Sequence, residues 1–551
     1  MENRRFILFA FLGVVLFFLY QAWQKDYGPQ PGAAPAAPEA ATADEVPTAS
    51  PAAPRPSNAA TPAAAVAAPA VAQVLRVETD VLRAEISTLG GELRRIELLG
   101  YPENKAHPEQ PLALLDDRSP RRFVLQSGLA GKQAPLTAPQ TVFSAGQTGY
   151  KLVEGADSVD VPLQYTDASG YSVTITYRFT RGSYEIGLTQ ALQNNGASEL
   201  AASPYVRFLR TQYTVGAEPR FTKPFLGVGL YEQSDPGSYR FKKHSFEELD
   251  KGGIELKQTG GWLAMMQHYF VAAIIPPADE ALTLSAKPRK DRGYAGQYLG
   301  ATQTVPAHGA HSFSTRLYIG PKLQNRVGQI SDGFELTLDY GILTPIAKPL
   351  FWVLEQFHKL TDNWGFAIIL LTLVVRMAMF KLSEAQYRSM ARMKKFAPKI
   401  QDIKDRYADD RERQQKAMMD LYKKEGFNPL AGCWPLLVQM PVFFALYWVL
   451  LESVELRQAP FALWIHDLSA ADPFYVLPVL YGITIFVQQK LSGQQMADPM
   501  QQKMMNVMPI AMTAFFVFFQ SGLVLYWLVS NLVGITQQAY ITRKLEKEGL
   551  R

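Results

Sequence analysis

Two kinds of hydrophobic pattern divide this chain. Long apolar runs without charged residues occur near the N-terminus and again after Leu350. Between them, apolar and polar residues alternate, as in the run Val173, Thr174, Ile175, Thr176, Tyr177, Arg178, Phe179, Thr180. Alternation with a period of two predicts a half-buried strand, whereas a long apolar run predicts a membrane helix. The pattern therefore predicts helices at both ends of the chain and a β domain between them.

The first apolar run, residues 6–23, follows Arg4 and Arg5. Its eighteen residues reach about 27 Å as a helix, enough to cross the apolar part of a bilayer. A cleaved signal peptide is the alternative, but Tyr20, Gln21 and Trp23 stand where small residues of a cleavage site would be expected. We therefore expect residues 1–27 to be a retained signal-anchor.

The last third of the chain contains further apolar runs, at 364–380, 430–451, 474–487 and 507–540. The last run is too long for one span of about 20 residues. The residues Gln520, Ser521 and Gly522 are expected to divide it in two. With the N-terminal run, the sequence predicts six transmembrane helices.

The distribution of basic residues predicts how these helices are oriented. The segment 381–428 is rich in Lys and Arg, whereas the segment 452–473 has only Arg457, and the tail has Arg543, Lys544, Lys547 and Arg551. Basic segments remain on the cytoplasmic side of bacterial inner membranes. Both termini are therefore expected in the cytoplasm, and the β domain on the periplasmic side of a multi-pass inner-membrane protein.

The segment between the first two predicted helices has two parts. Residues 28–72 are rich in Ala and Pro with few large apolar residues, which predicts a disordered linker. Residues 73–330 contain short alternating runs separated by turns such as Arg181-Gly182-Ser183, which predicts a large all-β sandwich. No GxSxG, P-loop or complete dinucleotide motif occurs there, so a structural or partner-binding domain is favoured over an enzyme.

Two amphipathic segments flank the second predicted span. Residues 339–361 have apolar residues at helical spacing and predict an interfacial helix, with packing against the β domain as the alternative. Residues 383–426 predict a cytoplasmic helical hairpin, whose apolar face could capture varied apolar clients or simply serve in packing. The residues on that face include Tyr387, Met390, Met393, Phe396 and Met418.

Overall composition narrows the chemistry. The formal net charge is only +5 over 551 residues, which does not indicate nucleic-acid binding. A single cysteine, Cys433, excludes a disulfide scaffold and a cysteine-rich zinc site. We therefore expect no metal and no cofactor.

A single charged residue stands well inside the C-terminal apolar runs. Arg376 follows Thr372 by one helical turn. A charge at the centre of a membrane helix costs about 2.5–3.5 kcal/mol, and arginine cannot lose its proton. One interpretation is that Arg376 snorkels toward Lys381. The other is a wet, positively charged cavity open to the cytoplasm, with polar residues spread over the other spans: Gln439, Thr484, Gln488, Gln520, Ser530 and Asn531.

The C-terminal third also resembles a known family. The stretches "NWGFAIILLTLVVRMAMFKLSEAQYRSMARMKKFAPKIQDIKDRYADD", "NPLAGCWPLLVQMPVFFALYWVLLESVELRQ", "DPMQQKMMNVMPI" and "SGLVLYWLVSNLVGITQQ" closely resemble the YidC/Oxa/Alb superfamily of membrane protein insertases. The anchor, linker, β domain and "GGWLAMMQHYFVAAIIP" look like its Gram-negative form, which has a large periplasmic domain.

This resemblance implies a fold and a mechanism. It implies a five-helix insertase core in residues 362–551 that encloses a hydrophilic groove, and a β-supersandwich in the periplasm. The groove residues would be Arg376, Thr372, Gln439, Trp527, Ser530 and Asn531. Trp527 stands where close relatives carry a tyrosine, so the ring is kept and the hydroxyl is lost.

The implied function is insertion, folding and assembly of nascent inner-membrane proteins without a catalytic residue, alone or with the Sec translocon. Implied partners also include the translating ribosome, the signal recognition particle receptor and membrane lipids. The chain stops soon after Leu550, so ribosome contact through a long basic tail is not expected. The alternatives are a polytopic secondary transporter and a membrane-anchored periplasmic carbohydrate-binding protein.

Overall fold

The computed structural model describes residues 72–118, 120–213, 225–290, 293–338, 340–407, 410–424, 434–492 and 499–547. Inside the helices it gives no side-chain description for some of these residues, among them 390–398. The predicted signal-anchor and nearly all of the predicted linker lie outside the described residues.

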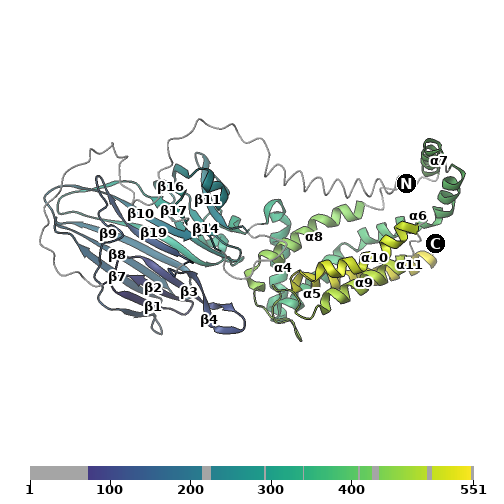
Figure 1. Ribbon diagram of the computed structural model, residues 1–551, viewed down its shortest axis with the longest axis horizontal. Coiled ribbons are helices and arrows are strands. Elements are labelled where there is room, and N and C mark those ends of the chain that lie inside the picture. The colour runs from purple at the N-terminus through teal and green to yellow at the C-terminus, as the bar shows by residue number, and fades with distance from the viewer. Residues whose placement is uncertain are drawn as a thin grey trace. The chain divides into compact units, whose positions relative to one another are not determined.

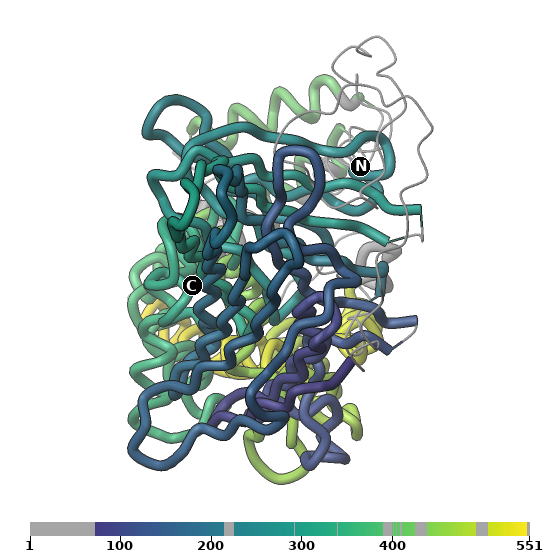
Figure 2. Tube along the Cα trace, turned by 90° about the vertical axis from the view of Figure 1, so that its left-hand side faces the viewer, coloured from purple at the N-terminus to yellow at the C-terminus, as the bar shows by residue number. Residues whose placement is uncertain are grey.

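The β domain consists of two large sheets (Figures 1 and 2). In the eleven-stranded sheet the order is β13 (Ile254–Thr259), β16 (Ala281–Pro288), β17 (Gly293–Leu299), β10 (Leu200–Thr211), β5 (Phe123–Gly131), β3 (Leu93–Asn104), β2 (Leu82–Ser87), β1 (Val74–Glu78) and β6 (Gly149–Lys151); β4 (His107–Leu115) pairs with β3 and β18 (Gln303–Val305) with β10. In the eight-stranded sheet the order is β12 (Ser238–Ser245), β11 (Gly227–Asp235), β14 (Leu263–Met266), β15 (Phe270–Ile275), β19 (Ala310–Pro321), β9 (Glu185–Asn194), β8 (Tyr171–Thr180) and β7 (Ser158–Thr166).

The alternating run that predicted a strand forms β8. Its four apolar residues from Val173 to Phe179 are at most 1% exposed and contribute to the core of the domain. The predicted hairpin is also confirmed, because β8 pairs antiparallel with β9 through a turn at Gly182, whose φ is +64°. Glycine adopts this left-handed conformation without steric cost, which explains its place in the turn. The predicted β sandwich is therefore present.

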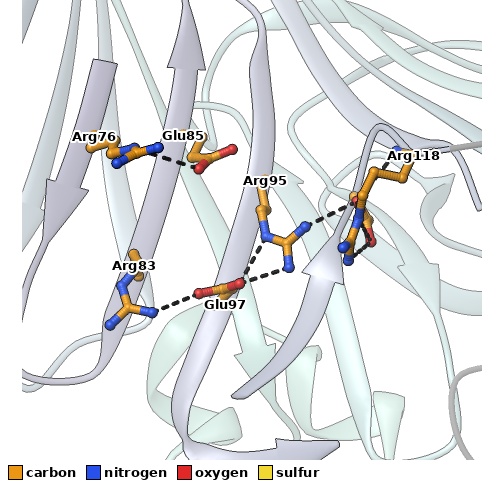
Figure 3. A network of polar contacts seen from close by, with 7 residues as sticks. Arg76, Arg83, Glu85, Arg95, Glu97 and Arg118 are labelled. Carbon is orange, nitrogen blue, oxygen red and sulfur yellow. Dashed lines mark hydrogen bonds and ion pairs between the residues drawn. The ribbon is translucent and has the colours of Figure 1, made fainter. Parts of the chain in front are cut away.

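One face of β2 and β3 carries cross-strand charged pairs (Figure 3). Glu97 accepts from Arg83 at 3.0 Å on the neighbouring strand and pairs with Arg95 at 2.7 Å on its own strand. Arg95 also lies 3.4 Å from Asp116, which Arg118 contacts at 2.7 Å. Opposite charges on neighbouring strands stabilise their pairing, so this network has a structural explanation.

The rest of the described chain is helical. The helices are α2 (Phe246–Lys251) within the β domain, then α3 (Val327–Ile330), η1 (Phe334–Thr337), η2 (Gly341–Leu343), α4 (Thr344–Thr361), α5 (Trp364–Ala378), α6 (Phe380–Arg406), α7 (Arg411–Lys424), α8 (Trp434–Glu452), η4 (Val454–Leu456), α9 (Val476–Ser492), α10 (Pro499–Phe516) and α11 (Ser521–Lys547). The predicted break of the last apolar run is confirmed, since α10 ends before Gln520 and α11 begins at Ser521.

The prediction of six transmembrane helices is not confirmed. No single helix among the described residues is long and apolar enough to cross a membrane by length and composition. One bent pair, α5 with residues 380–389 of α6, meets that test together, with a bend of 58° between them. The predicted hairpin is helical, but its first helix begins at Phe380 rather than Ser383. Asp410 caps its second helix by accepting from the Arg413 backbone N–H at 3.0 Å.

A buried polar joint connects the end of the β domain to the segment after α8. Lys322 is 2% exposed and its Nζ lies 3.4 Å from Oε2 of Glu452, which is 5% exposed. Gln324 donates its backbone N–H to Glu455 at 2.9 Å and its side-chain amide to Ser453 at 2.5 Å. Removing one partner of a buried ion pair typically costs about 3–5 kcal/mol, so Lys322 and Glu452 depend on each other.

Two titratable groups in this joint are displaced in opposite directions. Burial raises the pKa of Glu455 to about 7, although the backbone N–H of Gln324 counteracts this. Its other carboxylate oxygen has no hydrogen-bond partner among the described residues. Burial, together with the nearby charge of Lys322, lowers the pKa of His268 to about 3. The joint therefore favours a neutral Glu455 and a neutral His268.

We expect the joint to lose stability as the pH rises through neutrality. The folded chain keeps a proton on Glu455 that the unfolded chain loses near its ordinary pKa of 4.5, so this contribution falls between pH 4.5 and pH 7. Between pH 6 and pH 8 the loss is about 1 kcal/mol. The melting temperature, followed by tryptophan fluorescence in detergent, should fall over this range and fall less in Glu455→Gln. Glu109→Gln, at a side chain that is 64% exposed, is the matched control. An identical pH dependence in wild type and Glu455→Gln would contradict the assignment.

Candidate functional site

Polar side chains of three helices make contacts with one another near the centre of α11. Helix α11 packs against both α5 and α9 (Figure 1). Asn363 fixes the start of α5, because its side chain accepts from the backbone N–H groups of Gly365 and Phe366. Arg376 lies three turns later, near the end of this helix. We call the polar set Arg376, Ser530, Asn531, Gln537 and Thr484 the polar ring.

The contacts of Arg376 are made with α11. Its Nε donates to Oγ of Ser530 at 2.8 Å, and its backbone carbonyl accepts from Nε2 of Gln537 at 3.1 Å. In the part of the chain that the structure describes, no carboxylate lies within ion-pairing distance of this guanidinium. A half-buried cation is thus held by neutral dipoles, which leaves it able to attract a negatively charged or polar group.

Helix α11 provides most of the ring because of its spacing. Ser530, Gly534 and Gln537 recur at four and three residues and face α5 and α6. The carbonyl of Gly534 accepts from the hydroxyl of Tyr387 at 3.4 Å. Asn531 faces α9 instead and donates to Oγ1 of Thr484 at 2.8 Å. Gln537 was missed in the sequence, although its place seven residues after Ser530 puts it on the same helical face.

An aromatic cluster borders the polar ring. Trp527, which is 8% exposed, stacks on Phe443 of α8 with ring centroids 5.7 Å apart. It also contacts Phe516 of α10 at 4.1 Å, Phe519 at 5.5 Å and Tyr481 of α9 at 6.4 Å. The Trp527 ring is thus packed among aromatic side chains and is largely buried.

The cluster separates the ring from the β-domain end of the helices. The start of α11 is held by the segment after α8, through Ser521 N–H to the Ala470 carbonyl at 2.7 Å and Gly522 N–H to the Leu468 carbonyl at 2.9 Å. The same segment contacts the β domain, where Arg457 donates to the Pro102 carbonyl at 2.9 Å. Trp527 comes before Ser530 on α11, so the aromatic rings lie between that end and the ring.

Two further predicted groove residues, Thr372 and Gln439, differ in burial and in hydrogen bonding. Thr372 is 1% exposed, and its hydroxyl donates to the Ile368 carbonyl of its own helix at 2.6 Å. In this structure it therefore presents no free hydroxyl to the ring. Gln439 lies on α8, half-buried, without a hydrogen bond to Arg376.

The predicted capture residues of the hairpin are only partly described. The side chains of Met390, Met393 and Phe396 lie outside the described residues, whereas Met418 is half-buried on α7. The base of α6 is tied to α11, because Lys544 of α11 lies 2.8 Å from Glu384 of α6. Arg388, one turn further along α6, lies 3.6 Å from the same oxygen of Glu384. Tyr387 lies at this base and donates to the Gly534 carbonyl of α11.

Carboxylates of the charged face in the β domain are engaged by arginines. Burial alone raises the pKa of Asp116, but hydrogen bonds from Arg118 and the charge of Arg95 outweigh it and hold that pKa below its ordinary value. Such a group is a poor general acid at neutral pH. Within the described ranges, no three His, Cys, Asp or Glu side chains are arranged to hold a metal ion.

Comparison with known proteins gives matches over both regions. Residues 74–353 match the family model of the YidC periplasmic domain, and residues 356–548 match that of the 60Kd inner membrane protein. The membrane protein insertase YidC of Nitrosococcus oceani is 43% identical over 558 residues, covering 100% of both chains. The protein of the same name in Methylococcus capsulatus is also 43% identical, again over 100% of both chains.

The chain belongs to the YidC family.

A crystal structure described as an active YidC insertase with its first transmembrane domain resolved shares 18% identity and a TM-score of 0.36, over 85% of this chain and 94% of that chain. The full-length match to the YidC family favours neither a secondary transporter nor a carbohydrate-binding protein. The relatives are insertases, and the family models describe an inner-membrane protein and a periplasmic domain.

Proposed function

We infer that this chain is a membrane protein insertase and chaperone of the bacterial inner membrane, working on nascent membrane proteins. The structural observation that supports this is that the helices are apolar outside and partly polar inside, the reverse of a water-soluble helical bundle. The outer surfaces of the helices are apolar, whereas their inner contacts include the polar ring around Arg376. A polar client segment can pass along such a ring while the apolar segment enters lipid beside it.

The exposed apolar surface is concentrated on the helices. Helix α9 alone exposes Val479, Leu480, Ile483, Phe486, Val487 and Leu491. In the described part of the β domain, by contrast, Val74 and Val153 are the large apolar side chains in this class of exposure. Contiguous apolar patches of this kind are rare on water-soluble surfaces and suit a lipid environment.

We propose that the chain crosses the membrane six times. The crossings are residues 1–27, α5 with Phe380 at the start of α6, and α8, α9, α10 and α11. In this arrangement both termini and the hairpin 383–426 face the cytoplasm and the β domain faces the periplasm. The basic residues of 381–428 and of the tail support this orientation. The proposed partners are the Sec translocon, the translating ribosome and the signal recognition particle receptor. This part of the proposal rests on membership of the YidC family.

The role proposed for Arg376 is to supply positive charge near the path of the client. We expect Arg376→Lys to retain much of the insertion activity, because Lys keeps the charge and can still reach Ser530. Arg376→Ala should insert clients with acidic translocated tails less well, by roughly tenfold, since about 1–2 kcal/mol of charge attraction is lost. Insertion into vesicles containing the purified variants measures this. Ser530→Ala is the matched control, because it removes the hydrogen bond and keeps the charge. Equal insertion of acidic-tailed clients by wild type and Arg376→Ala would contradict the role.

The β domain is proposed to be dispensable for insertion up to its joint with the helices. A deletion of residues 28–321 keeps Lys322 and Gln324, so Glu452 retains its buried partner, and this deletion should still insert small clients. A longer deletion, 28–340, removes Lys322 and should lose activity or stability. Expression, melting temperature and insertion of both deletions are compared. If the shorter deletion is well expressed and inactive, the β domain takes part directly.

The hairpin is proposed to act early, by capturing clients at the cytoplasmic entrance. Deleting the hairpin, residues 383–426, should lower client contact near the polar ring. The other helices should stay folded, because α11 packs directly against α5 and α9. A photoreactive amino acid at Ser530 measures contact with a stalled client, with and without the hairpin. The control places it at Val524, a buried position of α11 on the other side of Trp527. Undiminished crosslinking at Ser530 would leave the hairpin without a capture role.

A further inference from the structure

A cavity of about 350 Å³ opens between α4 and the segment that ends the β domain. Gln324 and Tyr340 line it from one side, and Phe351 and Trp352 of α4 line it from the other. This size is within the range of small-molecule sites in proteins. None of the residues that line the cavity belongs to the polar ring, and the proposed insertion mechanism makes no use of the cavity.

The cavity also has charges of both signs around it. Lys348 and Glu335 lie 3.7 Å apart, with side chains that are 50% and 33% exposed. Glu355 is 17% exposed, accepts from Asn325 at 3.3 Å and lies 3.2 Å from Lys359, whose side chain is 60% exposed. The lining itself therefore combines one cation, Lys348, with two carboxylates. A purely anionic ligand would meet both carboxylates, whereas a ligand with an ammonium and a phosphate would find partners for each group.

The apolar surroundings suit a position at the edge of a bilayer. One face of α4 is buried through Ala347, Phe351 and Leu354. On the cavity side, Trp352 is 61% exposed, and just before α4 Ile342 is 95% exposed. Tryptophan is enriched at the boundary between lipid headgroups and water. Headgroups would therefore lie at the depth of the cavity mouth.

We propose that this cavity binds the headgroup of a phosphatidylethanolamine lipid from the leaflet facing the β domain. The ammonium lies toward Glu335 and Glu355, the phosphate toward Lys348, and Trp352 alongside the glycerol backbone. An ethanolamine ammonium has three N–H donors, enough for both carboxylates, whereas a choline headgroup has none. The inference rests on the membrane location proposed above for this chain.

The site is coupled to the joint between the β domain and the helices. Gln324 lines the cavity and at the same time bonds to Ser453 and Glu455. Asn325 and Glu355 likewise connect the end of the β domain to α4. A bound headgroup would hold α4 against this joint and so anchor the β domain to the membrane surface.

The test is lipid binding to the purified full chain, measured by native mass spectrometry in detergent. Dioleoyl phosphatidylethanolamine, phosphatidylcholine and phosphatidylglycerol are titrated separately. We expect phosphatidylethanolamine to bind several-fold more tightly than the other two. The double variant Glu335→Gln/Glu355→Gln should bind it roughly tenfold more weakly, for a loss of about 1.4 kcal/mol. Glu109→Gln is the control, because Glu109 is an exposed carboxylate of the β domain that does not line the cavity.

Lys348→Gln provides a second variant that is expected to fold, because the Lys348 side chain is 50% exposed. It removes the cation proposed to meet the phosphate, so its affinity for phosphatidylethanolamine should fall severalfold while its melting temperature stays unchanged. Equal binding of ethanolamine and choline lipids, a preference for phosphatidylglycerol, or unchanged binding by both variants would overturn the proposal. The measurement involves no client, so its failure would leave the insertase function untouched, and failed insertion would leave the lipid result standing.

Discussion

Arg376 has to keep its positive charge between helices whose outer surfaces are apolar. Arginine cannot become neutral by losing its proton, and the described residues offer it no carboxylate. The guanidinium Nε instead donates to the hydroxyl of Ser530 on α11, while Gln537 donates to the backbone carbonyl of Arg376 and links α11 to α5. This constraint explains why α11, unlike an ordinary apolar helix, carries Ser530 in its centre. In the role proposed for Arg376, a charge that is only partly satisfied attracts polar groups.

A charged site of this kind needs a barrier on one side. Trp527 and its aromatic neighbours supply that barrier next to Ser530, and they pack tightly enough to leave Trp527 only 8% exposed. Beyond them, the segment after α8 is fixed to α11 and to the β domain by hydrogen bonds. The buried ion pair between Lys322 and Glu452 adds a further contact at this end, and neither charge can remain buried without the other. Packed aromatic side chains thus lie between Ser530 and the β-domain end of α11.

The sequence predicted local structure well because local structure depends on neighbouring residues. The alternation in β8, the turn at Gly182, the break before Ser521 and the cap at Asp410 all follow from side chains a few positions apart. The positive charge of Arg376 inside an apolar run was also visible without a structure. The order of the strands in two sheets was not, because β10 pairs with β5 and β17 across long stretches of chain.

Other features of the structure were not predicted because they depend on contacts between residues that are far apart in the chain. The joint of Lys322 and Glu452 spans 130 residues, and no local pattern marks either side chain as buried. Thr372 satisfies the spacing of a groove residue, yet its hydroxyl bonds to its own helix, which is a common alternative for threonine in apolar surroundings. Trp527 stays a predicted groove residue, and in the structure its ring packs against four aromatic neighbours.

The energetics of insertion fit a weakly held polar ring. Each buried CH₂ of a client contributes about 0.8 kcal/mol, so a span of some twenty apolar residues strongly favours the inserted state. A charged residue carried through the apolar layer costs about 2.5–3.5 kcal/mol, and several such residues make a barrier rather than an unfavourable equilibrium. An insertase therefore has to lower this barrier without binding the polar segment so tightly that it stays. A cation held by one side-chain hydrogen bond can exchange that bond for one to the client and recover it afterwards. A complete ion pair in the same place would have to be broken at each passage, which is why the lack of an acidic partner for Arg376 among the described residues suits the role proposed for it.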